Sequence, residues 1–335
     1  MERIIKYFGR KINTAHPFTF VDVGAMDGIP KKWDDLVSFI KVVAFEPDER
    51  EFSKLTGLNN FTYFNYALSN SSEDLNFYVA QEAGKSSLYR PNQQVLSQFE
   101  GTNRFQTLSE KKVSREHVKT LDMITQEKFV TDVDFIKLDT QGSELAILEG
   151  GLKTLPQVFG IQIEVEFIEM YKNQPFFRDV DAFLNKAGFQ LMDLRRFYWK
   201  QKDYYDFVGK GQLVSADALY FKKMDIFADH LASREDSSYG YAKMVKAILI
   251  CLVYKAFDYA VLVALMGLER RYLSRKDYDE FKNMIIKASQ RGVWPDFPGR
   301  NIVYKVLNKI CEKLKPKSYL GWADSDRFIS NIKDI

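Results

Sequence analysis

The chain has 335 residues, of which 46% are hydrophobic and 15% aromatic, so it is long and apolar enough to bury a large core. This length favours one large domain with a smaller one beside it. A formal net charge of +3 is too small to indicate nucleic-acid binding. The 19 basic and 14 acidic side chains of residues 225–335 fit a solvated helical surface better than a nucleic-acid groove.

The two cysteines bear on the compartment. Cys251 and Cys311 both lie in apolar helical patterns, which favours buried free thiols and a reducing cytoplasm over a disulfide. No Cys/His cluster suggests a zinc site. The first nine residues lack the apolar core and the cleavage site of a secretory signal, so they predict a short amphipathic helix instead.

The most apolar region of the sequence, residues 244–268, is the only candidate for a membrane span. Lys246, Lys255 and Asp258 interrupt it. Charged residues are costly inside a bilayer, so this pattern favours a buried helix or helix pair. We therefore expect no transmembrane segment.

The first strand and its turn are the clearest signal in the chain. An apolar run over residues 18–23 predicts a buried strand with Asp22 near its end, and a second run, 42–45, ends in Glu46. A strand, a small-residue turn, a helix and a strand ending in a carboxylate predict a nucleotide-binding unit. An ordinary turn remains an equal alternative for this stretch alone, because its spacing is not G-x-G-x-x-G. The small residues of the turn are Gly24, Ala25 and Gly28.

The next part of the chain predicts β structure and a long loop. Residues 61–67 and 75–80 are β-forming and are separated by turn residues, which predicts a hairpin. Residues 81–112 are polar and weakly periodic. A loop of this length inside a compact domain is usually functional or mobile, so we expect a lid here.

Strands and helices then alternate. Residues 134–138 predict a strand ending in Asp139, and a helix follows over 143–155. The next strand, 160–167, carries Glu164 and Glu166 on one side. A helix over 177–186 leads to two final strands, 189–194 and 218–221, with no helical pattern between them.

This alternation indicates an α/β fold with a mostly parallel sheet. The two final strands should pair antiparallel at one edge, which is the Rossmann-like architecture of class I methyltransferases. We expect a catalytic domain over residues 1–224. Residues 225–335 predict an all-helical C-terminal region of unknown role, with helices at 241–268, 275–290 and 300–314.

Taken together, the motifs resemble those of the FkbM-type S-adenosylmethionine-dependent methyltransferases, over roughly residues 18–195. The most specific segment is I-K-[IL]-D-x-x-G-x-E, which begins at Ile136 and contains Asp139. The chain departs from the family at Gln141, where an acidic residue is frequent. The other matching segments are Asp22 to Gly28, Glu46-Pro47, Asn65 to Ser69, Ser86 to Leu88 and Thr120 to Asp122.

The resemblance implies an enzyme that binds S-adenosylmethionine and methylates a sugar hydroxyl in glycan or natural-product biosynthesis. It implies a small-molecule or glycan acceptor, while the small net charge already argues against nucleic acid. The helical region is a candidate surface for self-association. The residues expected to bind the cofactor are Asp22, Gly24, Ala25, Gly28, Glu46, Pro47, Asn65, Ala67 and Leu68.

Methyl transfer to a hydroxyl is an in-line displacement, which needs alignment and a base. The ends of parallel strands are where ligands bind in such sheets, so Asp139 and Glu164 are the predicted catalytic pair. They are also the candidate ligands of a divalent ion such as Mg²⁺. Asp139 could instead cap the helix that follows it, and Glu166 could form a salt bridge at the strand edge.

Two other classes of protein compete with the methyltransferase. A nicotinamide-dependent oxidoreductase on a Rossmann sheet is disfavoured, because Met26 interrupts the glycine motif and the Asp139 segment would have no role. A non-catalytic binding or assembly protein that retained the fold is compatible with the departure at Gln141.

Overall fold

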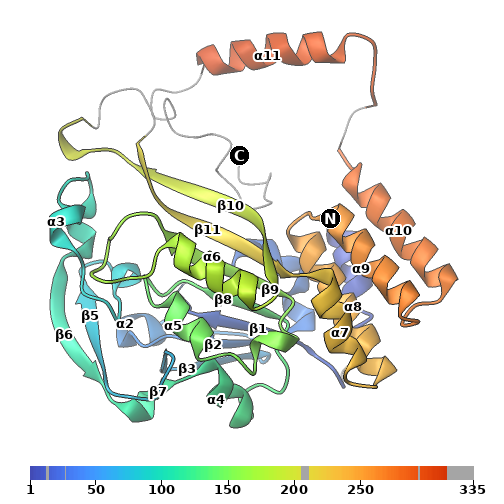
Figure 1. Ribbon diagram of the computed structural model, residues 1–335. Coiled ribbons are helices and arrows are strands. Elements are labelled where there is room, and N and C mark those ends of the chain that lie inside the picture. The colour runs from blue at the N-terminus through green and yellow to red at the C-terminus, as the bar shows by residue number, and fades with distance from the viewer. Residues whose placement is uncertain (13–14, 27, 205–210, 293–294, 315–335) are drawn as a thin grey trace.

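The computed structural model describes residues 1–12, 15–26, 28–204, 211–292 and 295–314. Its centre is a seven-stranded sheet in the order β10-β11-β9-β8-β1-β2-β3 (Figure 1). β11 runs antiparallel to both of its neighbours and the other neighbouring pairs are parallel. The predicted parallel sheet with an antiparallel final pair is therefore confirmed. The strands are β1 (Phe18–Val23), β2 (Ile40–Phe45), β3 (Phe61–Phe64), β8 (Phe135–Leu138), β9 (Gly160–Glu166), β10 (Phe189–Trp199) and β11 (Gln212–Lys222).

The predicted hairpin between residues 61–67 and 75–80 is wrong. β3 pairs in parallel with β2, and β5 (Leu75–Ala80) pairs antiparallel with β6 (Thr107–Val113). β6 escaped notice because its residues are polar and almost all exposed, so it lacks the apolar alternation of a half-buried strand. A third small sheet joins β4 (Ala67–Leu68) to β7 (Val118–Lys119).

Much of the predicted loop over residues 81–112 has regular structure. It contains the short helices η2 (Ala83–Lys85), α3 (Gln93–Leu96) and η3 (Thr102–Phe105), and then enters β6. Its role as a lid stays a prediction.

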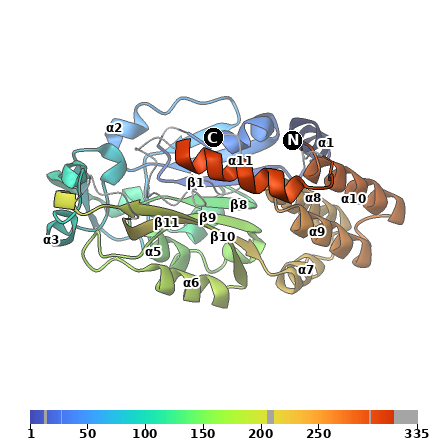
Figure 2. The same cartoon turned by 90° about the horizontal axis from the view of Figure 1, so that it is seen from above.

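Helices cover both faces of the sheet because each buried strand has two apolar faces. Phe18 and Phe20 of β1 point into one core, whereas Val21 and Val23 point into the other. In Figure 2, α5 and α6 lie on one side of the strands and α1 on the other. The first core packs against α1 (Glu2–Gly9), η1 (Lys31–Phe39), α7 (Met224–Ala232), α8 (Ser237–Val253), α9 (Phe257–Glu269) and α10 (Arg275–Ser289). The second packs against α4 (Leu121–Gln126), α5 (Glu144–Glu149) and α6 (Phe177–Lys186).

The most apolar stretch folds as the expected pair of helices, α8 and α9, and α8 is buried along most of its length. Among the described helices, none is both long enough and apolar enough to cross a bilayer. Cys251 on α8 is a buried free thiol, as expected. Cys311 is free but exposed, which corrects its predicted burial, because its helix, α11 (Arg300–Leu314), stands apart from the body.

A buried charge cluster ties α8 to the sheet. Lys243 Nζ lies 2.8 Å from Asp134 Oδ1 and 2.9 Å from Asp132 Oδ1, and Lys246 Nζ lies 3.1 Å from Asp134 Oδ2. Asp134, which precedes β8, also accepts the Thr19 backbone N–H of β1 at 2.8 Å. Charges removed from water are tolerated only when they are paired in this way. The domain boundary at residue 225 stays a prediction. It falls at the start of α7, and α8 beyond it shares a core with α1.

Replacing Lys243 with Met should leave Asp134 buried with fewer positive partners. We expect the free energy of unfolding to fall by about 3 kcal/mol in guanidinium denaturation at neutral pH. The matched control is Lys287→Met, at an exposed lysine of α10, which should change stability by less than about 0.5 kcal/mol. Equal effects of the two variants would show that the cluster does not hold α8 in place.

Candidate active site

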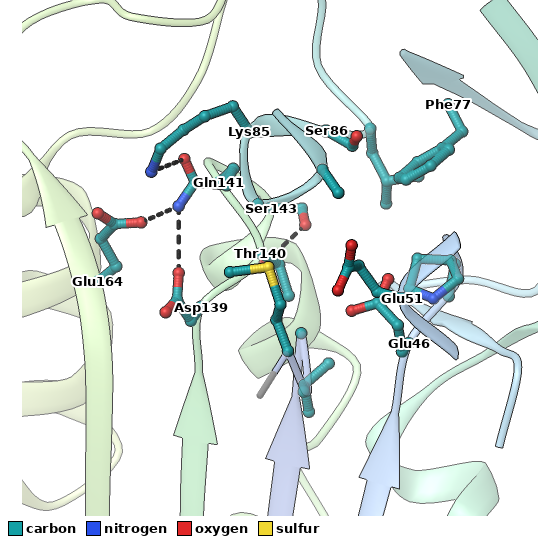
Figure 3. A pocket seen from close by; sticks show the side chains of 18 of the residues that line it. Glu46, Glu51, Phe77, Lys85, Ser86, Asp139, Thr140, Gln141, Ser143 and Glu164 are labelled. Atoms are coloured by element: carbon teal, nitrogen blue, oxygen red, sulfur yellow. Dashed lines mark hydrogen bonds between the residues drawn. The ribbon is translucent and has the colours of Figure 1, made fainter. Parts of the chain in front are cut away.

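A cavity of about 280 Å³ opens at the carboxyl ends of β1, β2, β8 and β9, with the segment 82–88 forming part of its wall (Figure 3). This is the edge of an open α/β sheet where ligands bind. The predicted residues that line it are Gly24, Glu46, Pro47, Ala67, Leu68, Asp139 and Glu164. Four predicted residues lie outside this lining. Asp22 and Ala25 are buried behind it, and Gly28 and Asn65 each line a separate groove.

The turn after β1 requires glycine at position 24. Gly24 has φ +77°, and a Cβ atom there would lie 2.0 Å from the carbonyl oxygen of Asp139. The Gly24 N–H donates to the Phe45 carbonyl at 2.9 Å. The turn is thus held between the ends of β2 and β8, which leaves space for a ligand against the backbone.

Glu46 faces the cavity from the end of β2. Its Oε1 accepts the Asp48 backbone N–H at 2.7 Å, and burial raises the pKa of its carboxyl to about 7. Asn65 Nδ2 donates to the Glu46 carbonyl oxygen at 2.8 Å, so Asn65 shapes the strand end without lining the main cavity.

Behind the cavity, Lys137 joins two carboxylates. Its Nζ lies 3.2 Å from Asp22 Oδ1 and 3.7 Å from Asp139 Oδ2. Burial raises the pKa of Asp22, and the charge of Lys137 opposes that shift. Desolvation would also raise the pKa of Asp139, but Lys137 and Lys85 outweigh it and hold that pKa below its usual value. Lys137 belongs to the I-K-L-D segment, but the sequence alone assigned it no role.

The amide of Gln141 lies between the two predicted catalytic carboxylates (Figure 3). Its Nε2 donates to Asp139 Oδ1 at 3.1 Å and to Glu164 Oε2. Its Oε1 accepts hydrogen bonds from Lys85 Nζ and from the Tyr171 hydroxyl, each at 3.1 Å. The amide nitrogen of Gln141 therefore links Asp139 to Glu164, and Lys85 and Tyr171 bind its amide oxygen.

Burial and neighbouring charges shift the pKa values of the cavity's carboxyls in different directions. Burial, together with the negative charge of Asp139, raises the pKa of Glu164 well above its usual value. Asp217 of β11 lies opposite Glu164 in the register and also lines the cavity. Burial and the charge of Asp139 raise the pKa of Asp217 to about 6. The pKa values of Asp139 and Glu164 are therefore shifted in opposite directions, so Asp139 ionises more readily than Glu164. The sequence did not predict Asp217 as a site residue, because the order of residues does not show which strand pairs with β9.

Hydrogen bonds connect the segment 82–88 to the turn that follows β8. The Ser87 hydroxyl donates to the Gln141 carbonyl at 2.7 Å, and the Tyr171 hydroxyl donates to the Lys85 carbonyl at 3.0 Å. On the other side, the Ser86 hydroxyl donates to Asp48 Oδ2 at 3.2 Å. The Ser86-Ser87-Leu88 motif thus closes one side of the cavity, a role that the sequence left unassigned.

Glu144 and Glu166 do not line the cavity. Glu144 accepts the backbone N–H groups of Thr140 and Gly142, at 2.6 and 2.9 Å, so it stabilises the turn that enters α5. Asp139 bonds to Gln141 instead of capping α5. The sequence predicted that Glu166 forms a salt bridge at the edge of the sheet. Its strand, β9, is not at the edge, because β11 pairs with it. Among the described residues Glu166 is buried and forms no ion pair.

The described residues do not fit a divalent metal ion. No group of three or more His, Cys, Asp or Glu side chains in the described part of the chain is arranged to hold one. Between Asp139 and Glu164 lies an amide that donates hydrogen bonds to both, which is unlike the oxygen-rich ligand set that Mg²⁺ requires. The predicted metal site at these two residues is therefore without support.

The strand order, with β11 as the reversed strand next to the edge, and the cavity at the carboxyl ends of the parallel strands define a class I methyltransferase fold. A family model, described as the methyltransferase FkbM domain, matches residues 22–191, just over half of the 335 residues. The chain belongs to this family. The matched range contains all the predicted site residues.

Solved structures are similar at low identity. A putative RNA methyltransferase from Pyrococcus horikoshii is 10% identical, with 66% of this chain and 82% of that chain covered and a TM-score of 0.29. Magnesium protoporphyrin IX methyltransferase from Synechocystis with bound SAM is 11% identical over 66% and 77%, with a TM-score of 0.30. The N-terminal domain of EvdMO1, solved with SAH and D-fucose, is 8% identical over 66% and 82%, with a TM-score of 0.30. No curated protein matches the chain.

Replacing Lys85 with Met should raise the pKa of Asp139, because a positive charge that favours its ionised form is removed. Carbon-detected NMR titration of labelled aspartate carboxyls measures this shift directly. Lys287→Met, far along the chain on α10, is the control and should leave the titration unchanged. An unshifted Asp139 in Lys85→Met would contradict the role of Lys85 in this charge network.

Proposed function

We propose that this protein is an S-adenosylmethionine-dependent O-methyltransferase that acts on a sugar hydroxyl in glycan or natural-product biosynthesis. One observation carries the proposal: a carboxylate suited to a ribose, Glu46, and a carboxylate pair suited to proton transfer, Asp139 and Glu164, line the same cavity. They come from three different strands, with the turn at Gly24 between them. The free thiols and the family domain are compatible with a cytoplasmic enzyme.

The cofactor would lie across the turn at Gly24. In this arrangement Glu46 accepts hydrogen bonds from the ribose hydroxyls, and Gly24 allows the methionine end to approach the backbone. Ala67 and Leu68 would contact the adenine, and Phe77, which lines the same part of the cavity, offers an aromatic face beside it. Asp22 is buried behind the turn and would contribute indirectly, through its ion pair with Lys137.

When bound, S-adenosylmethionine supplies an activated methyl group on a sulfonium, and the protein aligns the acceptor. Held by Glu46 and the turn at Gly24, the cofactor would give its methyl group to the acceptor oxygen in exchange for the carbon–sulfur bond and would leave as S-adenosylhomocysteine. The hydroxyl proton passes to Asp139, which is ionised and has 43% of its side chain exposed in the structure. Gln141, which donates hydrogen bonds to both Asp139 and Glu164, orients Asp139 and limits its movement.

A sugar ring would fit on the β10–β11 side of the cavity. Phe197 lines it there and offers an aromatic face, and Asp217 lines it with a carboxylate that can accept hydroxyl hydrogen bonds. Two further aromatic residues of this part of the sequence, at positions 205 and 207, lie outside the described residues. The family membership leaves an oxidoreductase without support. A non-catalytic protein with the same fold is one outcome of the activity test below.

Binding of S-adenosylhomocysteine should depend on the ionisation of Glu46. Its pKa in the free protein is about 7, and the ionised form is the better acceptor of ribose hydroxyls. Affinity should therefore rise by about tenfold between pH 6 and pH 8, measured by titration calorimetry. Glu46→Gln should bind more weakly at pH 8 and lose this pH dependence. A wild-type affinity that is flat across this range would contradict the assignment of Glu46.

Asp139→Asn should lower radiolabelled methyl transfer into sugar acceptors by about 10²–10⁴-fold, because the base is lost. S-adenosylmethionine binding, measured by calorimetry, should persist. Glu164→Gln, whose amide oxygen can still accept the hydrogen bond from Gln141, should be much less impaired. Activity should survive EDTA, given the absence of a fitting metal site among the described residues.

No transfer by the wild type into any acceptor, despite tight cofactor binding, would favour the non-catalytic reading. Transfer that EDTA abolishes would overturn the metal-independent site.

A further inference from the structure

The helix α11 has an exposed apolar face in the described part of the chain. In Figure 1 it stands away from the sheet and from the other helices. Its side chains from Asn301 onward, wherever the structure describes them, are all exposed. The seven large apolar ones have exposed fractions of 47–76%. These are Ile302, Val303, Tyr304, Val306, Leu307, Ile310 and Leu314. An exposed contiguous apolar surface of this kind marks a site of interaction.

The apolar face of α11 is wide. With 3.6 residues per turn, its apolar side chains cover an arc of roughly 200° around the helix axis. Polar residues occupy the remaining side, including Asn301, Lys305, Asn308 and Lys309. A helix that pairs with one other helix needs only the narrow stripe of a coiled-coil seam, and such a partner would leave much of this face in water.

The charge of α11 is strongly biased. Glu312 is the single acidic residue of the helix, against four basic residues, Arg300, Lys305, Lys309 and Lys313. Two further lysines follow in the sequence at positions 315 and 317. Lys305 and Lys309 lie on the polar side, and Lys313 lies at its border with the apolar face, so their long stems can reach along the helix to an anionic surface.

We propose that α11 docks the protein on a membrane surface that carries anionic lipid headgroups. The helix lies in the plane of the interface, with Leu307 and Ile310 at the centre of the face buried among the acyl chains, and the lysines contact phosphates. A half-apolar, cationic helix has the physical character of an interfacial anchor. The helix does not span the bilayer, which agrees with the lack of a spanning helix among the described residues.

The test is co-sedimentation of the full-length protein with vesicles at low salt. Equimolar phosphatidylcholine and phosphatidylglycerol vesicles should bind it, and pure phosphatidylcholine vesicles should not. Binding should weaken as ionic strength rises, because salt screens the attraction. The readout is independent of methyl transfer, so failure here would leave the proposed enzyme activity untouched.

Two neutral double variants separate the faces of the helix. Leu307→Gln with Ile310→Gln should lower vesicle binding more than tenfold, because two buried apolar side chains are lost. The control, Asn301→Gln with Asn308→Gln, introduces glutamine at two positions of the polar face. This variant should bind vesicles like the wild type. Lys305→Gln with Lys309→Gln should weaken binding by about fivefold per lysine. All three should unfold at the wild-type temperature, because the described side chains of α11 are exposed.

Three results would overturn the proposal. The first is no binding of the wild type to anionic vesicles, and the second is equal binding to both kinds of vesicle. The third is a dimer in light scattering that Leu307→Gln with Ile310→Gln dissociates while vesicles remain unbound. That last outcome would instead identify α11 as a self-association surface.

Discussion

The close approach of two strand ends is the constraint on which the site depends. The turn after β1 passes so near the end of β8 that position 24 tolerates no side chain beyond hydrogen, since a Cβ atom would collide with the Asp139 carbonyl. Behind this contact, Lys137 joins Asp22 to Asp139. A larger residue at position 24 would push the two strand ends apart and move Asp139 away from the cavity. The backbone and the ion pair therefore position the site together.

Around this contact, the charges of the cavity form one network. Gln141 bridges Asp139 and Glu164, and Lys85 and Tyr171 hold Gln141 in turn. An amide nitrogen supplies two donors without a charge, so it can link two carboxylates without adding a charge to the pair. The same residues anchor the segment 82–88, which means that the electrostatics of the pair and the position of that wall are coupled. Gln141, at which the chain departs from the family, is thus a member of this network because it binds both carboxylates.

The sequence predicted several residues that line one cavity, but it did not predict the strand pairings around that cavity. Asp139, Glu46 and Gly24 were found because strand ends next to small residues can be recognised from local order alone, and the structure brings them to one cavity. Asp217 was missed because it enters through the pairing of β11 with β9, which residue order does not encode. The hairpin was misassigned for the same reason: the pattern of β5 shows a strand but not that its partner is the polar β6.

The sequence by itself determined the class of fold, the alternation of strands and helices, and the positions of the turn and of the I-K-L-D segment. These depend on local periodicity and on short motifs, whose physical meaning lies within a few residues. Only the tertiary structure decided which carboxylates share a cavity, in which direction the pKa of each is shifted, and that α8 is bound to the sheet by buried charges. Those properties depend on distances and desolvation between groups far apart in the chain, which no local pattern contains.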